Sequence, residues 1–123
     1  MKNIGFIAII FFIPLIVNAE TYLCISEAGA VVEDGANKKI DSGLSNVSNS
    51  KYILTNESGK WLLKKHGGGL IFSECKSSSF CESSKGFSGI FFKSEKNIFS
   101  RVWLTVLNGR NQLITEKGYC SKI

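Results

Sequence analysis

The chain has 123 residues, with 15 lysines and arginines against 10 acidic residues, and a net charge of +5 at pH 7. This length fits one domain, and the charge predicts a mildly basic surface. Arg101 and Arg110 are the only arginines. Because specific phosphate and base recognition favours the bidentate guanidinium group, a surface dominated by lysine argues against dedicated nucleic-acid binding.

The first nineteen residues have the pattern of an export signal. Lys2 precedes an apolar run over residues 4–17, and Val17-Asn18-Ala19 is the small-x-small pattern of a cleavage site. The run is shorter than the roughly twenty residues that a membrane-spanning helix needs. We therefore predict a signal peptide over residues 1–19 and one exported domain over residues 20–123. The mature chain is expected to have no membrane span and to reside in the periplasm or outside the cell.

The mature chain of 104 residues, with its net charge lowered to +4 by the loss of Lys2, begins with short runs rich in β-branched and aromatic residues. Turn-forming residues separate these runs every eight to twelve residues, which is typical of an all-β meander. In the first half we predict strands over residues 22–26, 30–33, 38–40, 51–55, 60–66 and 70–75. The serine-rich residues 41–50 predict a surface loop, and Asn56-Glu57-Ser58-Gly59 predicts a hairpin connection.

In the second half the same alternation predicts strands over residues 86–92, 98–107, 110–115 and 119–123. Charged residues 93–96 predict one turn, and residues 116–118 predict another. Asn108-Gly109 between two alternating apolar runs predicts a type I′ hairpin turn. The fold class is therefore all-β, an antiparallel meander of about eight strands closed as a small barrel or folded as a two-layer sandwich. Periodicity does not choose between these two architectures.

Four cysteines are placed so that they favour disulfides over metal binding. In an oxidising compartment, four cysteines in about a hundred residues predict two disulfides. Of the three pairings we favour Cys24–Cys120, which would join the first strand to the last, and Cys75–Cys81, which would close the short loop of residues 76–80. The spacing provides neither the close pairs of a zinc site nor the C-x-x-C of a thiol oxidoreductase. We expect no metal and no cofactor.

Residues for catalysis are scarce, because His66 is the only histidine and no G-x-S-x-G context surrounds a serine. We therefore expect a protein that is not an enzyme. The alternative is a small secreted hydrolase resembling a ribonuclease, with His66 as the acid and a carboxylate as the base. Its further candidates are the bases Glu57 and Glu74 and the phosphate-binding cations Lys64 and Arg101.

Two surface features are candidate binding sites. One is the basic turn Lys64, Lys65 and His66; the other is the loop between Cys75 and Cys81, with Lys76 and Phe80. A loop stiffened by a disulfide loses little entropy when it binds a partner. We expect the domain to be a monomeric binding module for a protein partner, as an inhibitor would be, or for a small apolar ligand inside a barrel.

Three segments carry a resemblance. Residues Thr21-Tyr22-Leu23-Cys24-Ile25, Lys51-Tyr52-Ile53-Leu54 with Gly59-Lys60-Trp61, and Gly118-Tyr119-Cys120-Ser121-Lys122-Ile123 resemble small exported disulfide-containing β proteins of Gram-negative bacteria with no assigned function. More distantly, Tyr-x-Cys near the start of the chain is similar to periplasmic inhibitors of c-type lysozyme. Those inhibitors carry Ser-Gly-x-x-Tyr, whereas Ser88-Gly89-Ile90-Phe91-Phe92 has phenylalanine at the last position, so no inhibitory residue is carried over.

Overall fold

The chain was studied as a computed structural model, which describes residues 19–35, 39–46, 50–68, 71–83 and 89–123. The predicted signal peptide lies outside these residues, except for Ala19. Within them the chain forms one antiparallel sheet and contains no helix that is long and apolar enough to cross a membrane. The strands are β1 (Thr21–Asp34), β2 (Ile40–Leu44), β3 (Lys51–Glu57), β4 (Lys60–Lys65), β5 (Ile71–Ser77), β6 (Phe80–Ser83), β7 (Gly89–Lys93), β8 (Ile98–Leu107) and β9 (Arg110–Lys122).

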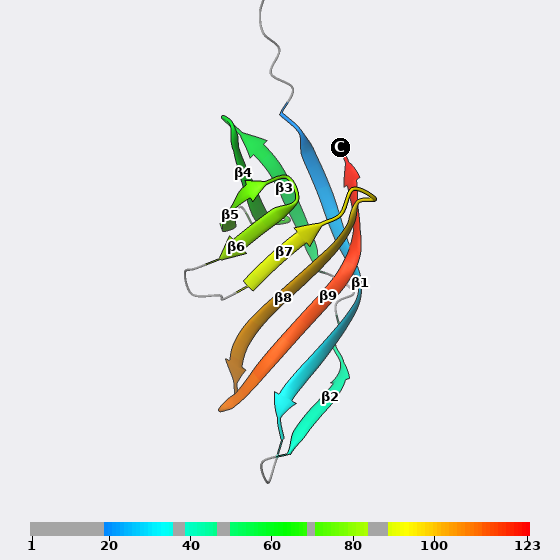
Figure 1. Cartoon of the computed structure of the whole chain (residues 1–123), viewed down its shortest axis with the longest axis vertical. Helices are drawn as coiled ribbons and strands as arrows, with labels where there is room; N and C mark the ends of the chain where they lie inside the picture. Colours follow the sequence, from blue (N-terminus) through cyan, green and yellow to red (C-terminus); the bar gives the residue numbers. More distant parts are fainter. Residues whose placement is uncertain (1–18, 36–38, 47–49, 69–70, 84–88) are drawn as a thin grey trace, which may run out of the picture.

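The sheet closes on itself as a barrel. Consecutive strands pair from β3 to β9, and β1 pairs with both β3 and β9. The eight strands apart from β2 therefore form a closed barrel, and β2 lies beside the second half of β1 as an additional strand (Figure 1). The predicted all-β meander is confirmed, and the architecture is the barrel.

The first predicted strands differ from the observed ones. Residues 22–26 and 30–33 belong to one long strand, β1, which bends at a bulge between Ser26 and Ala28. The prediction of a surface loop over residues 41–50 is wrong for residues 41–44, because they belong to β2. All five residues of β2 are exposed, and their sequence, Ile-Asp-Ser-Gly-Leu, lacks the apolar alternation that marks a half-buried strand. Backbone pairing with β1 is what makes this segment a strand.

The predicted turn over residues 116–118 is also wrong, because β9 continues through it without interruption. Gly118 is explained by close packing between strands. A Cβ atom at this position would lie 1.9 Å from the carbonyl oxygen of Ile25 and 2.8 Å from the ring of Phe99. A glycine inside a strand often marks a close backbone approach, and here it allows β1 and the core to pack against β9.

Two hairpin turns have the left-handed backbone that their sequences favour. Asn108 and Gly109 have φ angles of 52° and 73°, so the predicted type I′ turn between β8 and β9 has the positive φ values it needs. Ser58 and Gly59 have φ angles of 53° and 83°. The connection between β3 and β4 is therefore a two-residue turn, tighter than the predicted four-residue connection.

The barrel interior contains an apolar core at its centre. Phe91 and Phe99 are almost fully buried and stack with their ring centroids 5.2 Å apart. The ring of Tyr52 meets Phe99 edge-on at 6.0 Å, and Leu54 and Leu63 complete the buried cluster with the cysteines. Strand alternation brings these side chains inside, because they occupy every second position of their strands.

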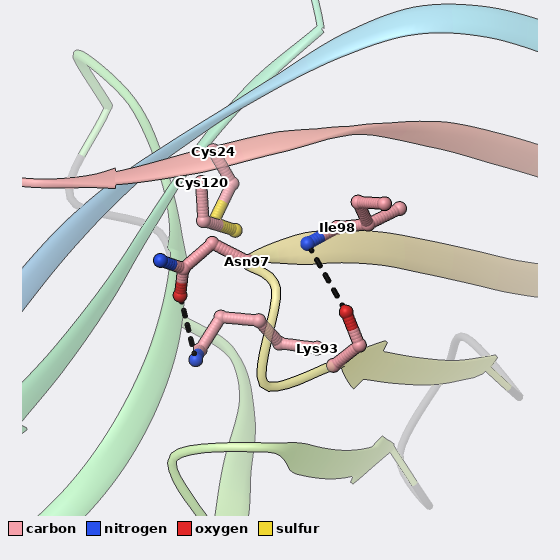
Figure 2. Close-up of a disulfide and its surroundings, with 6 residues drawn as sticks. Cys24, Lys93, Asn97, Ile98 and Cys120 are labelled. Atoms are coloured by element: carbon pink, nitrogen blue, oxygen red, sulfur yellow. Dashed lines mark hydrogen bonds between the residues drawn. A yellow bond between two sulfur atoms is a disulfide. The ribbon is translucent and has the colours of Figure 1, made fainter.

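Both predicted disulfides are present and use all four cysteines. Cys24 and Cys120 lie directly opposite each other on β1 and β9, so their bond links the first and last strands of the barrel. Figure 2 shows this disulfide beside the turn that contains Asn97, whose backbone oxygen accepts a hydrogen bond from the Cys120 N–H at 2.8 Å. Two disulfides indicate an oxidising compartment.

Part of the sheet continues beyond the barrel. The last pair between β7 and β8 is Gly89 with Trp103, and β8 then runs on with β9 as its neighbour. We call the parts of β8, β9, β1 and β2 beyond this point the extension (residues 104–113, 30–34 and 40–44). In Figure 1 the extension projects below the barrel strands β4–β7. Its outer face exposes the apolar side chains of Leu104, Val106 and Leu113.

Candidate functional site

A pocket of about 400 Å³ lies at the end of the barrel from which the extension projects. Its walls come from the start of β3, the end of β4, the start of β5 and the middle of β8 and β9. We call this end the pocket end. The opposite end, with the Cys24–Cys120 disulfide and the turn containing Asn97, is called the disulfide end.

The floor of the pocket is a buried set of hydrogen-bonded polar groups. Glu116 is 3% exposed, and its Oε2 accepts a hydrogen bond from the hydroxyl of Tyr52 at 2.5 Å. The same oxygen accepts a second hydrogen bond from the hydroxyl of Ser26 at 3.1 Å. A buried carboxylate is costly unless donors satisfy it. These two donors therefore hold the Glu116 side chain in one position.

Arg101 lies above this floor and opposite Glu116 in the register of β8 and β9. Its Nη1 donates a hydrogen bond to the Tyr52 hydroxyl at 2.8 Å. Aromatic rings surround the guanidinium: its central carbon lies 4.1 Å from the ring centroid of Trp103, 4.8 Å from that of Phe72 and 5.0 Å from that of Tyr52. Among the described residues, no carboxylate forms an ion pair with Arg101 within 4.0 Å.

Tyr52 connects the core to the pocket. Its ring packs on Phe72 and Phe99, and its hydroxyl lies between Glu116 and Arg101. Burial, followed by the hydrogen bond to Glu116, raises the pKa of Tyr52 to about 12, and the charge and hydrogen bond of Arg101 offset this rise only in part. The hydroxyl therefore remains protonated at neutral pH, which is why it can donate to Glu116.

The rim of the pocket carries further positive charge. Lys51 and Lys65 line it from β3 and β4, and His66 follows Lys65 with its backbone N–H donating to the carbonyl of Lys51 at 3.1 Å. Among the described residues, the lining therefore contains three cations, Arg101 included, and one carboxylate, that of Glu116. Positively charged walls attract anions, and the low dielectric of a partly buried site strengthens that attraction.

The structure separates the three residues of the predicted basic turn. Lys65 and His66 line the pocket. Lys64 points to the other face of β4, as strand alternation requires, and pairs with Glu57.

The second predicted binding feature lies elsewhere on the barrel. Lys76 is on β5 and Phe80 begins β6, so the predicted loop of residues 76–80 is a hairpin with Ser78 and Ser79 at its tip. The Lys76 ammonium lies 5.8 Å from the ring centroid of Phe80 and 3.8 Å from a carboxylate oxygen of Glu82. Neither Lys76 nor Phe80 lines the pocket.

The candidate hydrolase residues are only partly brought together. His66 and Arg101 line the pocket, but Glu57 is paired with Lys64 and Glu74 is not part of the lining. The carboxylate that does share the pocket with His66 is Glu116. Among the described residues, no cluster of three histidines, cysteines or acidic residues is close enough to hold a metal ion.

The segment compared with lysozyme inhibitors is described only in part. Ser88 lies outside the described residues, and Gly89 begins β7. Phe91 points into the core, whereas Phe92 is half exposed on the outer face of the barrel.

Sequence reasoning missed Glu116 and the Tyr52 hydroxyl as site residues. Glu116 falls in the expected turn over residues 116–118, and Tyr52 falls in the expected strand over residues 51–55, where no motif marks its hydroxyl as a site group. One pattern was available as a signal: Phe99, Arg101 and Trp103 alternate along one strand, so a cation and an indole share a face with a buried phenylalanine.

The fold and the pocket define a small disulfide-bonded antiparallel β-barrel with a cationic and aromatic pocket at one end. No protein-family model, curated protein or solved structure matches this chain.

Proposed function

We propose that this protein is a small exported binding module of the bacterial envelope or secretome, and that the pocket end of the barrel is its binding site. The observation that carries the proposal is the pocket itself, in which cations and aromatic rings surround a floor of fixed polar groups. Binding sites in proteins are typically concave, with apolar walls and a few oriented polar groups. The predicted export signal and the two disulfides support a location in the periplasm or outside the cell.

Binding is favoured over chemistry because the pocket combines fixed polar groups with cations and aromatic rings, and no established catalytic motif is among its described residues. The Tyr52 and Ser26 hydroxyls both donate to Oε2 of Glu116, so this carboxylate is held in one orientation. A protein inhibitor is one form that such a module takes, with a side chain of the inhibited protein inserted into the pocket.

The test is partner capture with matched rim variants. The exported protein, purified with its disulfides formed, is immobilised and exposed to envelope and extracellular extracts. We expect a stoichiometric partner or ligand to be lost from the Lys65→Ala/His66→Ala variant and retained by Lys64→Ala, which removes the adjacent cation on the other face of β4. Retention by the double variant, or equal loss from both variants, would show that the pocket end is not the binding site.

The hydrolase is a second candidate, and one observation favours it: His66, Arg101 and Glu116 line the same pocket. If His66 were the acid of a secreted ribonuclease, His66→Ala would abolish RNA cleavage by the purified protein while Lys64→Ala would not. A wild-type protein that leaves RNA intact over the pH range of histidine titration would exclude this candidate.

A further inference from the structure

We infer that the pocket recognises a carboxylate, held by the free edge of the Arg101 guanidinium between aromatic walls. This inference rests on the proposed function and specifies its ligand class. The ligand is a carboxylate attached to an apolar group, and two sources supply this chemistry: the carboxyl end of a peptide chain and a free small organic acid.

Arg101 has more hydrogen-bond donors than the described part of its own chain uses. A guanidinium group has five N–H donors in one plane. In this protein Nη1 donates to Tyr52, and no described carboxylate lies within 4.0 Å of the group. Arg101 is therefore held in place by one hydrogen bond, with donors remaining for a ligand in the pocket.

Aromatic rings are the other neighbours of the Arg101 guanidinium. The Trp103 ring centroid lies 4.1 Å from the central carbon of Arg101, so the indole is within cation–π distance. Phe72 and Tyr52 are also within 5.0 Å. Aromatic rings do not accept strong hydrogen bonds, so these neighbours do not use up the remaining N–H donors of Arg101. A planar carboxylate matches the edge of a guanidinium with two parallel hydrogen bonds.

The charges around the pocket favour a ligand with a single negative charge. Lys51, Lys65 and Arg101 favour an anion, but Glu116 lies beneath Arg101 as a buried negative charge. A second negative charge on the ligand would be repelled by Glu116 at short range, where the local dielectric weakens screening. A carboxylate carries one negative charge, whereas a phosphate monoester carries nearly two at neutral pH. The pocket is therefore better matched to the carboxylate.

The walls of the pocket favour an apolar group on the rest of the ligand. Trp103 and Phe72 give the pocket apolar walls, and its volume of about 400 Å³ accommodates more than a carboxylate group. An aromatic or branched aliphatic group next to the carboxylate would bury its surface against these rings. We therefore expect 3-phenylpropanoate to bind more tightly than acetate.

The experiment compares an acid with its amide. The oxidised exported protein is titrated with 3-phenylpropanoate, 3-phenylpropanamide and inorganic phosphate, using calorimetry and the fluorescence of Trp103, with Trp103→Phe identifying the emitting residue. We expect the acid to bind at least tenfold more tightly than the amide, because a charge-assisted bidentate pair is lost in the amide. A peptide with a free carboxyl-terminal phenylalanine and its amidated form then distinguish the two sources. Preference for the free-acid peptide over the small acid identifies a peptide end.

Variants of Arg101 provide a second test of carboxylate binding. Arg101→Lys retains the positive charge but removes the planar fork, and we expect it to weaken acid binding about tenfold. Arg101→Gln removes the charge too and is expected to weaken binding further. Lys76→Ala is the matched control, because it removes one cation outside the pocket. Circular dichroism and thermal unfolding check that each variant is folded, and Arg101→Lys carries the test if Arg101→Gln does not fold.

Several results would overturn the inference. Equal affinity for acid and amide, tighter binding of phosphate, undiminished binding by Arg101→Lys, or no binding of any of these acids at millimolar concentration would each exclude carboxylate recognition by Arg101. These failures are distinct from failure of the proposed function, which is decided by whether Lys65→Ala/His66→Ala loses its captured partner.

Discussion

Each of the two ends of the barrel packs a cation against aromatic rings, but the two cations have different surroundings. At the disulfide end, Lys93 is 6% exposed, its ammonium lies 4.6 Å from the ring centroid of Tyr22, and it donates to Oδ1 of Asn97 at 3.2 Å (Figure 2). At the pocket end, Arg101 lies among the rings of Trp103 and Phe72 and faces a pocket.

A cation packed against aromatic rings is therefore not by itself a sign of a ligand site. Lys93 is directed at a turn of its own chain, where its ammonium donates to Asn97 and faces the Tyr22 ring, and it does not line the pocket. Arg101 has a planar group with more donors than its neighbours accept. We therefore expect changes at the disulfide end to alter stability and changes at the pocket end to alter binding.

The largest expected effect comes from the Cys24–Cys120 disulfide. It joins residues 96 apart in sequence, and the chain-entropy estimate for a loop of this size is a contribution of about 4.7 kcal/mol to the free energy of unfolding. Replacing both cysteines with alanine should lower stability by about this amount in chemical denaturation.

The matched control is Cys75→Ala/Cys81→Ala, which opens a loop closed at a separation of 6 and should cost roughly 2.4 kcal/mol by the same estimate. Equal losses from the two double variants would contradict the view that the disulfide end stabilises the closed barrel.

The next largest loss of stability is expected from substitution of Gly118, which lies in the barrel wall near the disulfide end. A methyl group at this position meets the Ile25 backbone, which cannot rotate away as a side chain would. Overpacking of this kind costs about 3 kcal/mol, so Gly118→Ala should unfold at a clearly lower denaturant concentration.

Gly43→Ala in β2 provides the contrast, because a Cβ atom there has nothing within 4 Å. This variant should be neutral or slightly more stable, since glycine is the less favourable residue in a strand by about 0.5 kcal/mol. A comparable loss at Gly43 would mean that the extension packs more tightly than its exposure indicates.

The sequence predicted the barrel strands better than the pocket, for a physical reason. The Asn108-Gly109 turn depends only on local backbone preferences, and the four cysteines allow only three pairings. The predicted turn and the predicted disulfides are both confirmed. The pocket depends on which face of β8 points inward. Its sequence alternates Val102 and Leu104 with Arg101 and Trp103, and hydrophobicity alone favours burial of the aliphatic pair.

In the structure Arg101 and Trp103 face inward instead, because Phe99 determines which face of β8 points into the barrel. Phe99 faces the core, which fixes Arg101 and Trp103 on the inner side by the two-residue period. Val102 and Leu104 then lie on the outer face, where they are exposed. Glu116 pairs with Arg101 in the register that the two-residue Asn108-Gly109 turn sets, but the expected turn over residues 116–118 hides this pair from the sequence pattern.

A third effect is expected from titration of Tyr52 at the pocket end. The pKa of this tyrosine is raised from 10.0 to about 12, so the folded protein holds the proton more tightly than the unfolded chain does. The corresponding stabilisation is fully present below pH 10 and is lost as the pH rises from 10 to 12. It amounts to about 2–3 kcal/mol.

Absorbance of tyrosinate measures this directly. The difference between the titration curves of the wild-type protein and Tyr52→Phe should have its midpoint near pH 12, and the loss of stability above pH 10 should be smaller in the variant. A midpoint near pH 10 would mean that the Tyr52 hydroxyl is not buried against Glu116, and that the pocket floor is open to water.

The smallest effect, and the one that separates the two ends most clearly, is expected from Lys93→Met. The substitution removes a buried charge and its hydrogen bond to Asn97, while the thioether keeps contact with the Tyr22 ring. Loss of the cation–π contact and relief of the buried charge oppose each other, so we expect stability to change by less than about 1 kcal/mol. Affinity for 3-phenylpropanoate should stay within twofold of the wild-type value. In the same titration Arg101→Lys is expected to lower this affinity about tenfold. A similar loss of affinity in Lys93→Met would mean that the two ends are coupled through the core formed by Tyr52 and Phe99.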